Sequence, residues 1–392
     1  MIPKTPADGA GELPLGTLAG FLAGARRADL WLASRADAAA LLLVAAGAAA
    51  RLIAAGGTGL SVDETLHLRI AASPTLRETY RVSLFNAHPP LFVLLLHGWM
   101  RVAASAWALR LLPVAFGVAM LWAGYRWSRA AFGTAASLMT LVLLSFLPAL
   151  VVVSAELRGY SAMLAFMAAA LLCLELALEE RSGVRLALFA VFGALSLLSH
   201  YSAAWFLLAA FSSGTIRVIR RGVTARFRLA WTASALAVAA LSFFLYETHV
   251  SRLRGGALEA EARSDWLRES YFRAGSESPW GFLGRQTLSV FEFLFSTKPA
   301  AVVALALTVG GLAVLFARRR PAASLLALPF VFAAAAGLTG LCPYGGTRHC
   351  VHLAPFAAAI VGVALAELSG RRLWAFVLLA AVLAPAAFAV GL

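Results

Sequence analysis

Charged residues are scarce in this chain. Only 13% of its 392 residues are charged, whereas 61% are hydrophobic and the mean hydropathy is +0.82. A soluble domain carries about 25% charged residues, so the composition excludes an ordinary soluble protein. Apolar stretches of about 17–25 residues recur along the whole length, which is typical of membrane-spanning helices. We therefore expect an all-α polytopic membrane protein.

Lysine is almost absent as well, because Lys4 and Lys298 are the only two. Arginine therefore carries nearly all of the formal net charge of +14. In a polytopic membrane protein most of this charge belongs in cytoplasmic loops, so we expect no nucleic-acid partner. The chain also lacks a GxGxxG nucleotide-binding fingerprint. Residues 1–37 do not read as a cleavable signal, and we expect a cytoplasmic tail there.

Eleven stretches have the length and apolarity of transmembrane helices. They are residues 38–55, 111–125, 135–153, 161–178, 184–199, 203–216, 229–246, 300–316, 322–341, 351–366 and 373–390. A further apolar stretch, 88–100, is ambiguous because its uninterrupted apolar part is short and is broken by His97 and Arg101.

The distribution of arginine decides whether 88–100 crosses the membrane. Cytoplasmic loops carry an excess of Arg and Lys. If 88–100 does not cross, a large set of arginines falls on one side: 26, 27, 35, 126, 129, 181, 185, 217, 220, 221, 226, 228, 318–320, 371 and 372. We therefore predict about eleven spans, a juxtamembrane helix at 88–100, a cytoplasmic N-terminus and an outer C-terminus.

This topology divides the chain and brings its polar segments to one face. After the tail we expect a catalytic transmembrane module, 38–230, with a first outer loop at 58–109. A C-terminal module, 231–392, comes next, with an outer loop at 248–298. Polar segments at 60–88, 154–160, 199–201 and 342–352 then share the outer face with that loop. Ionisable groups at a membrane are costly, so their convergence indicates a functional site.

The stretch "SVDETLHL", 61–68, starts the first outer loop. Ser61 and Glu64 have the spacing of a helix capping box, which leaves open whether Glu64 does more than begin a helix. Asp63 and His67 are four residues apart and share a helix face. They suit a base with its partner, or two ligands of a divalent metal ion.

Cationic and imidazole groups recur in the other outer segments. In "AHPPL" two prolines leave His88 at the start of an apolar helix, where it could meet an anionic lipid headgroup or have no role. In "SAELRGYSA", Glu156 could reach Asp63 and Arg158 could reach a phosphate, although a local ion pair is the alternative.

Two further segments complete the outer face. "SHYSA" places His200 and Tyr201 at a tight turn, where tyrosine usually marks the membrane interface. In "CPYGGTRHCVHLAP", Arg348 is the expected phosphate clamp and His349 is its neighbour. Three states of its two cysteines remain open: a disulfide between Cys342 and Cys350, a reduced pair, or metal binding with His349 and His352.

The ordered set of motifs resembles the GT-C superfamily of membrane glycosyltransferases. "DE" comes after the first span, "HPPL" precedes the second, "SAELRGY" comes after the third and "GGTRH" lies late in the chain. The resemblance is greatest to the bacterial branch related to protein O-mannosyltransferases and lipid A aminoarabinose transferases. It covers residues 38–230 well and implies a GT-C-like helical bundle.

The resemblance also implies roles for individual residues. Asp63 matches the acidic residue that activates the acceptor, Glu64 its acidic neighbour and Glu156 the acidic residue of the second outer loop. His88 occupies the position near the lipid phosphate. With Arg158, Arg348 and His349 it forms the expected donor-phosphate site, and His67, His200 and Tyr201 are further candidates.

The function implied is transfer of a hexose or pentose from a polyprenyl-phosphate donor to a hydroxyl of a lipid, glycan or protein. The expected place is the outer, periplasmic face of the cytoplasmic (inner) membrane. No cofactor is expected except the divalent metal ion left open for Asp63 and His67. Alternatives are a lipid-linked saccharide transporter or flippase and a polysaccharide polymerase or ligase. A transporter would show inverted repeats and ionisable groups near mid-bilayer, and neither is evident.

Overall fold

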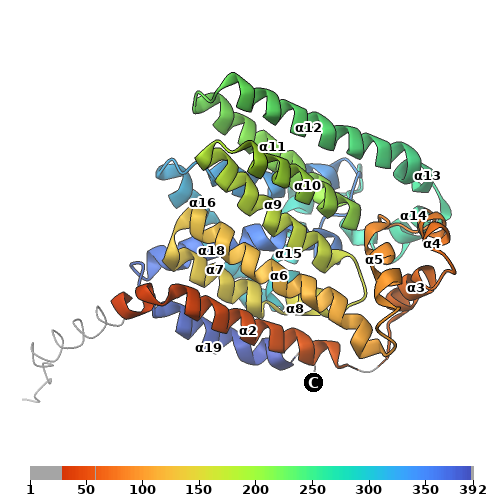
Figure 1. Ribbon diagram of the computed structural model, residues 1–392, viewed down its shortest axis with the longest axis horizontal. Coiled ribbons are helices and arrows are strands. Elements are labelled where there is room, and N and C mark those ends of the chain that lie inside the picture. The colour runs from red at the N-terminus through yellow and green to blue at the C-terminus, as the bar shows by residue number, and fades with distance from the viewer. Residues whose placement is uncertain (1–28, 58, 390–392) are drawn as a thin grey trace, which may run out of the picture.

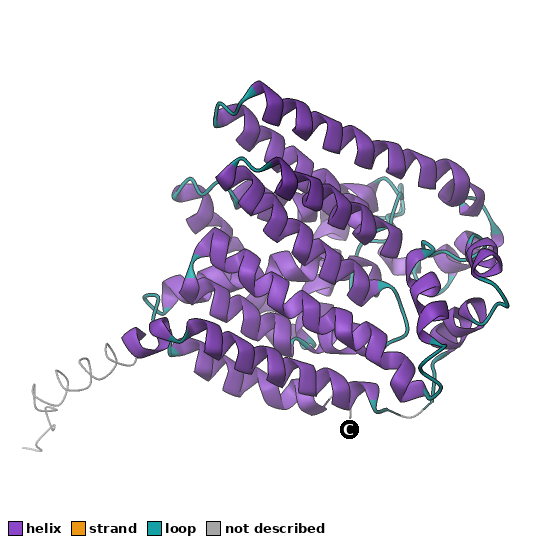
Figure 2. Cartoon of the chain, in the orientation of Figure 1, coloured by secondary structure: helices purple, strands orange, loops and turns teal. Residues whose placement is uncertain are grey.

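The computed structural model describes residues 29–57 and 59–389. Every regular element in this described part is a helix, so the predicted all-α fold is confirmed (Figure 2). Residues 1–28 of the predicted cytoplasmic tail lie outside the described residues.

Each of the eleven predicted spans coincides with a helix or a helix pair. These are α2 (Ala36–Ala55), α6 (Ala106–Phe132), α7 (Thr134–Phe146) with α8 (Pro148–Ala155), α9 (Tyr160–Glu180), α10 (Gly183–Ser199), α11 (Ala203–Arg220), α12 (Ala225–Leu245), α16 (Lys298–Ala317), α17 (Ala323–Leu338), α18 (Ala354–Leu368) and α19 (Ala375–Ala389).

By length and composition, six helices of the described chain can cross a membrane, or seven if the bent pair of α7 and α8 is one span. The shorter apolar helices α10, α17 and α19 add to these. The chain thus forms a polytopic bundle, and the count of eleven spans stays a prediction.

The first outer loop folds into three short helices, α3 (Val62–Ala71), α4 (Leu76–Ser83) and α5 (Leu91–Trp99). With nine residues, α5 is far shorter than the roughly 20 residues that a span requires. It packs against α3 and α4 at one end of the bundle (Figure 1). A short helix thus forms within the predicted 88–100 stretch, and its juxtamembrane position stays a prediction.

The second long outer segment has more structure than predicted. A π-helical turn (Tyr246–Val250) ends α12, and it leads into α13 (Ser251–Leu253), α14 (Ala257–Ser264) and a 3-10 turn (Arg268–Ser270). The segment ends in α15 (Pro279–Phe295), a helix of 17 residues that packs against α16. The sequence predicted a loop over 248–298 because Arg285, Gln286 and Glu292 interrupt the apolar residues of α15.

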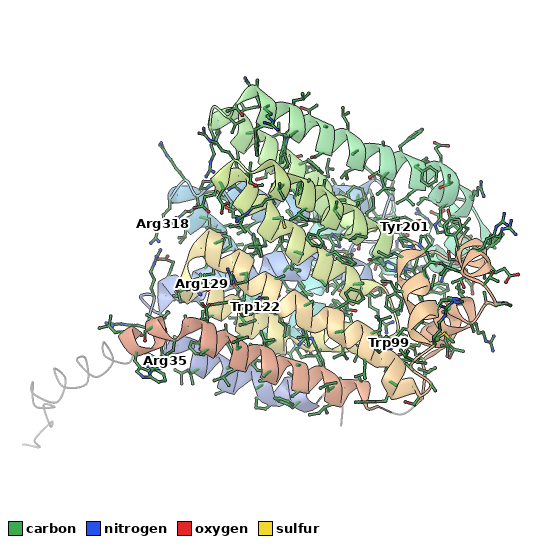
Figure 3. The ribbon with its side chains drawn as sticks, in the orientation of Figure 1. Arg35, Trp99, Trp122, Arg129, Tyr201 and Arg318 are labelled. Atoms are coloured by element: carbon green, nitrogen blue, oxygen red, sulfur yellow. The ribbon has the colours of Figure 1, made fainter. Side chains whose placement is uncertain are left out.

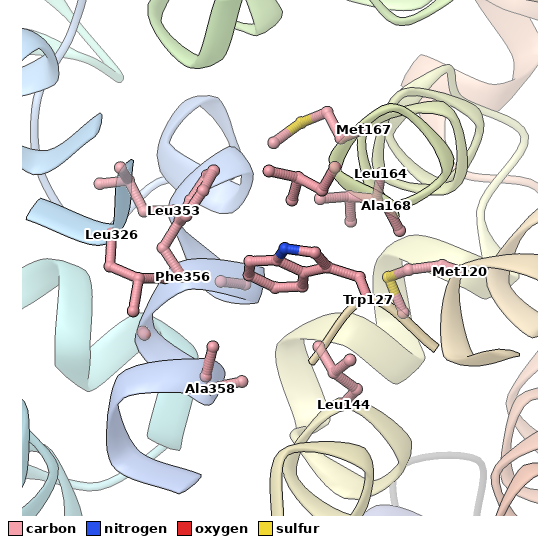
Figure 4. Packing of buried hydrophobic residues seen from close by; sticks show 14 of the residues in the cluster. Met120, Trp127, Leu144, Leu164, Met167, Ala168, Leu326, Leu353, Phe356 and Ala358 are labelled. Atoms are coloured by element: carbon pink, nitrogen blue, oxygen red, sulfur yellow. The ribbon is translucent and has the colours of Figure 1, made fainter. Parts of the chain in front are cut away.

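The core lies around α9 and the stretch Arg348–Leu368, which contains α18. In the most apolar 18 residues of these two stretches, 72% and 83% of the residues are buried. Trp127 is fully buried there, among side chains of α6, α7, α9 and α18 that include Met120, Leu144, Leu164 and Phe356 (Figure 4). Small residues allow close helix approach, as is usual in membranes. A Cβ on Gly362 of α18 would come within 2.4 Å of Thr140 Oγ1 in α7. Helices of both predicted modules therefore share one core.

Candidate active site

The predicted polar segments meet at one end of the bundle. There α3, the link between α8 and α9, the turn after α10 and the segment 342–353 approach one another. Tyr201 and Trp99 lie at this end, whereas Arg35, Arg129 and Arg318 lie at the opposite end (Figure 3). Side chains that are far apart in the sequence can therefore form one site.

Ser61 and Glu64 form the predicted capping box at the start of α3. Ser61 Oγ accepts from Glu64 N at 3.3 Å, and Glu64 Oε2 accepts from Ser61 N at 2.9 Å. Both oxygens of Glu64 also accept from the guanidinium of Arg110, at 2.8 and 2.9 Å, and Oε1 accepts from Leu157 N at 3.1 Å. The carboxylate is thus fully hydrogen-bonded and only 2% of Glu64 is exposed.

Arg110 of α6 is a site residue that no sequence motif predicted. It also donates to the carbonyl oxygens of Ala55, Gly57 and Gly59, where the chain leaves α2. Burial alone would raise the pKa of Glu64, but the hydrogen bonds from Arg110 and from two backbone N–H groups lower it. The pair therefore ties α2, α3, α6 and the α8–α9 link together. The one sign of this pair in the sequence was the position of Arg110, next to the predicted second span.

Asp63, the neighbour of Glu64, points away from Arg110 and its side chain is half exposed. Its Oδ2 accepts from Arg158 at 2.6 Å and from Arg348 at 3.3 Å. Its Oδ1 accepts no hydrogen bond from any described residue. The structure thus joins three predicted site residues from α3, the α8–α9 link and the segment before α18.

Glu156 joins the same group through Arg348, whose Nη2 lies 3.3 Å from Glu156 Oε1. The other oxygen, Oε2, is buried and has no partner in the described chain. Burial raises the pKa of Glu156, although the charges of Arg348 and Arg158 oppose the rise. Arg348 therefore stands between the carboxylates of Asp63 and Glu156 and holds both.

Four predicted histidines form a row beside these ions. Ring centroids of His67 and His88 are 5.2 Å apart, those of His88 and His200 5.1 Å, and those of His200 and His349 6.0 Å. Arg158 donates to Nε2 of His88 at 3.3 Å. Burial lowers the pKa of His88 well below its ordinary value, and the neighbouring imidazoles and Arg158 disfavour its protonation further. Burial also lowers the pKa of His67, His200 and His349, so these rings are neutral at neutral pH.

A cavity of about 590 Å³ opens beside this cluster. Its polar wall carries Asp63, His67, His88, Arg158, Arg348 and His349. The facing wall comes from the outer segment after α12 and carries Leu253, Glu259, Trp266, Leu267, Tyr271 and Phe293. No motif in the sequence predicted this second wall, because its aromatic residues have no regular spacing. The cavity lining thus combines cationic groups with apolar and aromatic side chains and the carboxylate of Glu259.

Tyr201 has a different place. Its hydroxyl hydrogen-bonds Nδ1 of His249, and Nε2 of His249 bonds the carbonyl of Asn86 at 2.8 Å. This chain of contacts links the α10–α11 turn to the π-helical turn and to the segment before His88. Tyr201 does not line the cavity, and its contacts join elements that surround the cavity.

The described residues contain no group of three or more His, Cys, Asp or Glu side chains placed to hold a metal ion. His67 Nδ1 bonds the backbone carbonyl of Asp63 at 2.8 Å, not its carboxylate. The divalent ion left open for this pair thus gains no third ligand in the described chain.

The cysteines of the late motif are reduced, so the disulfide alternative is wrong for this structure. Cys350 is buried and its Sγ lies 3.5 Å from Gly345 N and 3.7 Å from Pro343 O, inside the turn. Burial raises the pKa of the Cys342 thiol to about 11. The Cys350 thiol therefore contacts only groups of its own turn, and the Cys342 thiol is desolvated.

Known proteins share the fold of this chain. Residues 87–246 match the model of the dolichyl-phosphate-mannose-protein mannosyltransferase family, and no curated protein matches the chain by sequence. The oligosaccharyltransferase of Archaeoglobus fulgidus with a tethered acceptor peptide aligns with 92% of this chain and 56% of its own, at 13% identity and TM-score 0.55. ArnT from Cupriavidus metallidurans bound to undecaprenyl phosphate aligns over 86% and 62%, at 16% identity and TM-score 0.53. The chain has the GT-C fold of membrane glycosyltransferases.

A third similar structure is AglB from Archaeoglobus fulgidus with an inhibitory peptide and a dolichol-phosphate, at 14% identity and TM-score 0.51. The chain spans between 55% and 62% of the length of these three similar structures. The predicted resemblance to GT-C glycosyltransferases is thus confirmed at the level of the fold.

Proposed function

We propose that the protein transfers a sugar from a polyprenyl-phosphate donor to an acceptor hydroxyl at the outer face of the cytoplasmic membrane. One observation carries the proposal: Asp63 offers a free carboxylate oxygen beside two guanidiniums in one cavity. A base and a cationic phosphate site are the two requirements of such a transfer. The ligands of two similar structures, undecaprenyl phosphate and a dolichol-phosphate, support the donor class.

In the proposed reaction the acceptor oxygen forms a bond to the anomeric carbon, and the bond from that carbon to the phosphate oxygen breaks. Asp63 Oδ1 takes the acceptor proton as the bond forms. The departing polyprenyl phosphate gains negative charge, which Arg158 and Arg348 stabilise, with His88 as a further hydrogen-bonding group. Glu64 holds α3 in place, and Glu156 orients Arg348.

The test uses the purified protein in nanodiscs with polyprenyl-phosphate hexose and pentose donors and cell-envelope extract as acceptor. Asp63→Asn should lower transfer by about 10²- to 10⁴-fold, the usual contribution of a general base. Binding of undecaprenyl phosphate should persist, because both guanidiniums remain. Arg158→Gln should instead weaken that binding by roughly 10- to 100-fold, as expected for loss of a charge-assisted hydrogen bond.

Asp37→Asn is the matched control, since Asp37 is a carboxylate paired with Arg129 at the other end of the bundle. It should leave both transfer and donor binding unchanged. Near-normal transfer by Asp63→Asn would refute its role as base. Preference for the hexose or the pentose donor would assign the sugar class.

A further inference from the structure

A second cavity of about 340 Å³ adjoins the main one. Trp266, Gly346 and Thr347 line both cavities, so they form the boundary between them. We call this second cavity the annex. It lies at the outer end of the bundle, because the outer segment after α12, α15 and the 345–347 turn build its walls. Its volume is within the range of about 300–1,000 Å³ that small-ligand sites occupy.

The segment 344–346 lies close to α15 and to Ser270, which also line the annex. Gly346 N donates to Ser289 Oγ at 3.0 Å, and Tyr344 N donates to Ser270 O at 2.8 Å. A Cβ on Gly345 would lie 2.2 Å from Gln286 Oε1, and one on Gly346 would lie 2.4 Å from Ser289 Oγ. Only glycine permits this approach, so the shape of the annex depends on the "GG" of the late motif.

The annex differs in chemistry from the main cavity. Its lining includes the exposed charged side chains of Asp265, Arg268 and Glu269, none of which is in an ion pair with another described residue. Thr347 Oγ1 is buried and has no hydrogen-bond partner in the described chain. The lining of the annex thus offers carboxylates, a guanidinium and a hydroxyl, and Trp266 is the one large apolar residue among the residues that line it.

That side chain is Trp266, which is 55% exposed and lies at the boundary of the two cavities. An indole offers a flat apolar face, whereas the neighbouring groups offer donors and acceptors for hydroxyls. A pyranose ring presents both, an apolar face of C–H groups and a rim of hydroxyls. A lipid tail would leave the charges of the annex unmatched.

We propose that the annex is the acceptor subsite and that the acceptor is a carbohydrate, one of whose sugar rings stacks on Trp266. This inference rests on the proposed function and names its acceptor class. When one sugar ring of the acceptor lies in the annex, the acceptor hydroxyl beside that ring extends past Trp266 and Thr347 into the cavity that holds Asp63. Asp265, Arg268 and Glu269 bind the remaining hydroxyls, and the cationic wall stays free for the donor phosphate.

Saturation-transfer-difference NMR on the protein in nanodiscs tests the proposal. The probes are methyl hexopyranosides, methyl pentopyranosides and a short Ser/Thr peptide. Glycosides should receive saturation at their ring protons, and the peptide should not. Trp266→Ala should weaken glycoside binding by about 2- to 12-fold, the loss expected for one aromatic contact. Glu269→Ala should weaken it as well.

Trp280→Ala is the matched control, because Trp280 belongs to the same outer segment, is 82% exposed and lines neither cavity. It should bind glycosides as the natural protein does, and Trp266→Phe should keep most of the binding. Peptide binding without glycoside binding overturns the inference, as does equal glycoside binding by Trp266→Ala. Binding of undecaprenyl phosphate is measured in parallel. If either contradicting result occurs while undecaprenyl phosphate still binds, only the acceptor subsite is wrong. If the natural protein does not bind undecaprenyl phosphate, the proposed function fails.

Discussion

Asp63 and Glu64 are adjacent in the sequence, yet their carboxylates have opposite surroundings. Successive residues of a helix point about 100° apart, so one side chain of α3 faces the bundle and the other faces the cavity. Glu64 is buried against Arg110, whereas Asp63 is half exposed between Arg158 and Arg348. The resemblance to GT-C enzymes predicted a role for both. In the proposed mechanism Glu64 is a positioning residue, because both of its oxygens are taken by Arg110 and backbone N–H groups.

Removal of Arg110 should destabilise the protein. Arg110→Ala leaves the Glu64 carboxylate buried without a counter-ion, and we expect a loss of about 3–5 kcal/mol in the free energy of unfolding. Thermal unfolding in detergent measures it. Arg185→Ala, which breaks the exposed pair with Glu180, is the control and should cost at most about 1 kcal/mol. Equal losses for the two variants would contradict the structural role of Arg110.

The buried imidazole of His88 predicts a dependence of stability on pH. Its pKa in the folded protein is lowered below the unfolded value of about 6.5, so the unfolded chain binds a proton first as pH falls. The free energy of unfolding should therefore show no loss from His88 above about pH 6.5 and should decrease as the pH falls below that value. Glu156, whose pKa is raised, acts in the opposite direction at lower pH.

Comparison of thermal unfolding between the natural protein and His88→Gln isolates this effect, since Glu156 is common to both. The variant should show a flatter dependence on pH between about 7 and 5. Parallel curves would show that His88 is not the group that titrates.

At the scale of elements, the break between α7 and α8 is the clearest example of sequence and tertiary contact acting together. The two helices meet at an angle of 55°. Pro148 has no N–H, so the carbonyl of Leu144, four residues earlier, has no helical donor. Arg51 of α2 supplies one at 2.9 Å and also donates to Ser145 O at 3.0 Å. An arginine buried in the bundle thus completes the end of a helix.

Arg51→Leu should therefore destabilise the bundle. Two carbonyl oxygens would lose their donors, and each buried unsatisfied group costs about 1–3 kcal/mol. Thermal unfolding should show the loss. Arg126→Leu, which changes an exposed arginine of α6, should change stability by no more than about 0.5 kcal/mol. A stable Arg51→Leu variant would mean that water or another group replaces the guanidinium.

At the scale of the whole molecule, the two ends of the bundle differ in charge and chemistry. Arg35, Arg129 and Arg318 lie at one end, and the site lies at the other (Figure 3). The positive-inside rule predicts that the arginine-rich end lies in the cytoplasm. The site should then face outwards, where a lipid-linked sugar and its acceptor can meet.

Labelling of single cysteines in intact cells tests this orientation. A cysteine at position 126 or 318 should react with a membrane-impermeant thiol reagent only after permeabilisation. One at position 268, in the outer segment, should react at once. Labelling of position 126 in intact cells would show that 88–100 crosses the membrane and that the topology beyond it is inverted.

The sequence by itself determined the membrane bundle, because runs of apolar residues record where helices cross lipid, whatever their neighbours. It also determined the helix start at Ser61, since a capping box depends only on residues three apart. Asp63, His88, Arg158 and Arg348 were predicted by motif and by side of the membrane, and the structure brings them together.

Only the tertiary structure decided which of these groups touch. Arg110 and Arg51 act on partners 46 and 93–94 residues away, and no local pattern records such contacts. The aromatic wall and the annex depend on how α15 and the 345–347 turn pack against each other. A membrane span is determined by one continuous stretch of residues, whereas a site made from several distant stretches forms only after those stretches have packed together.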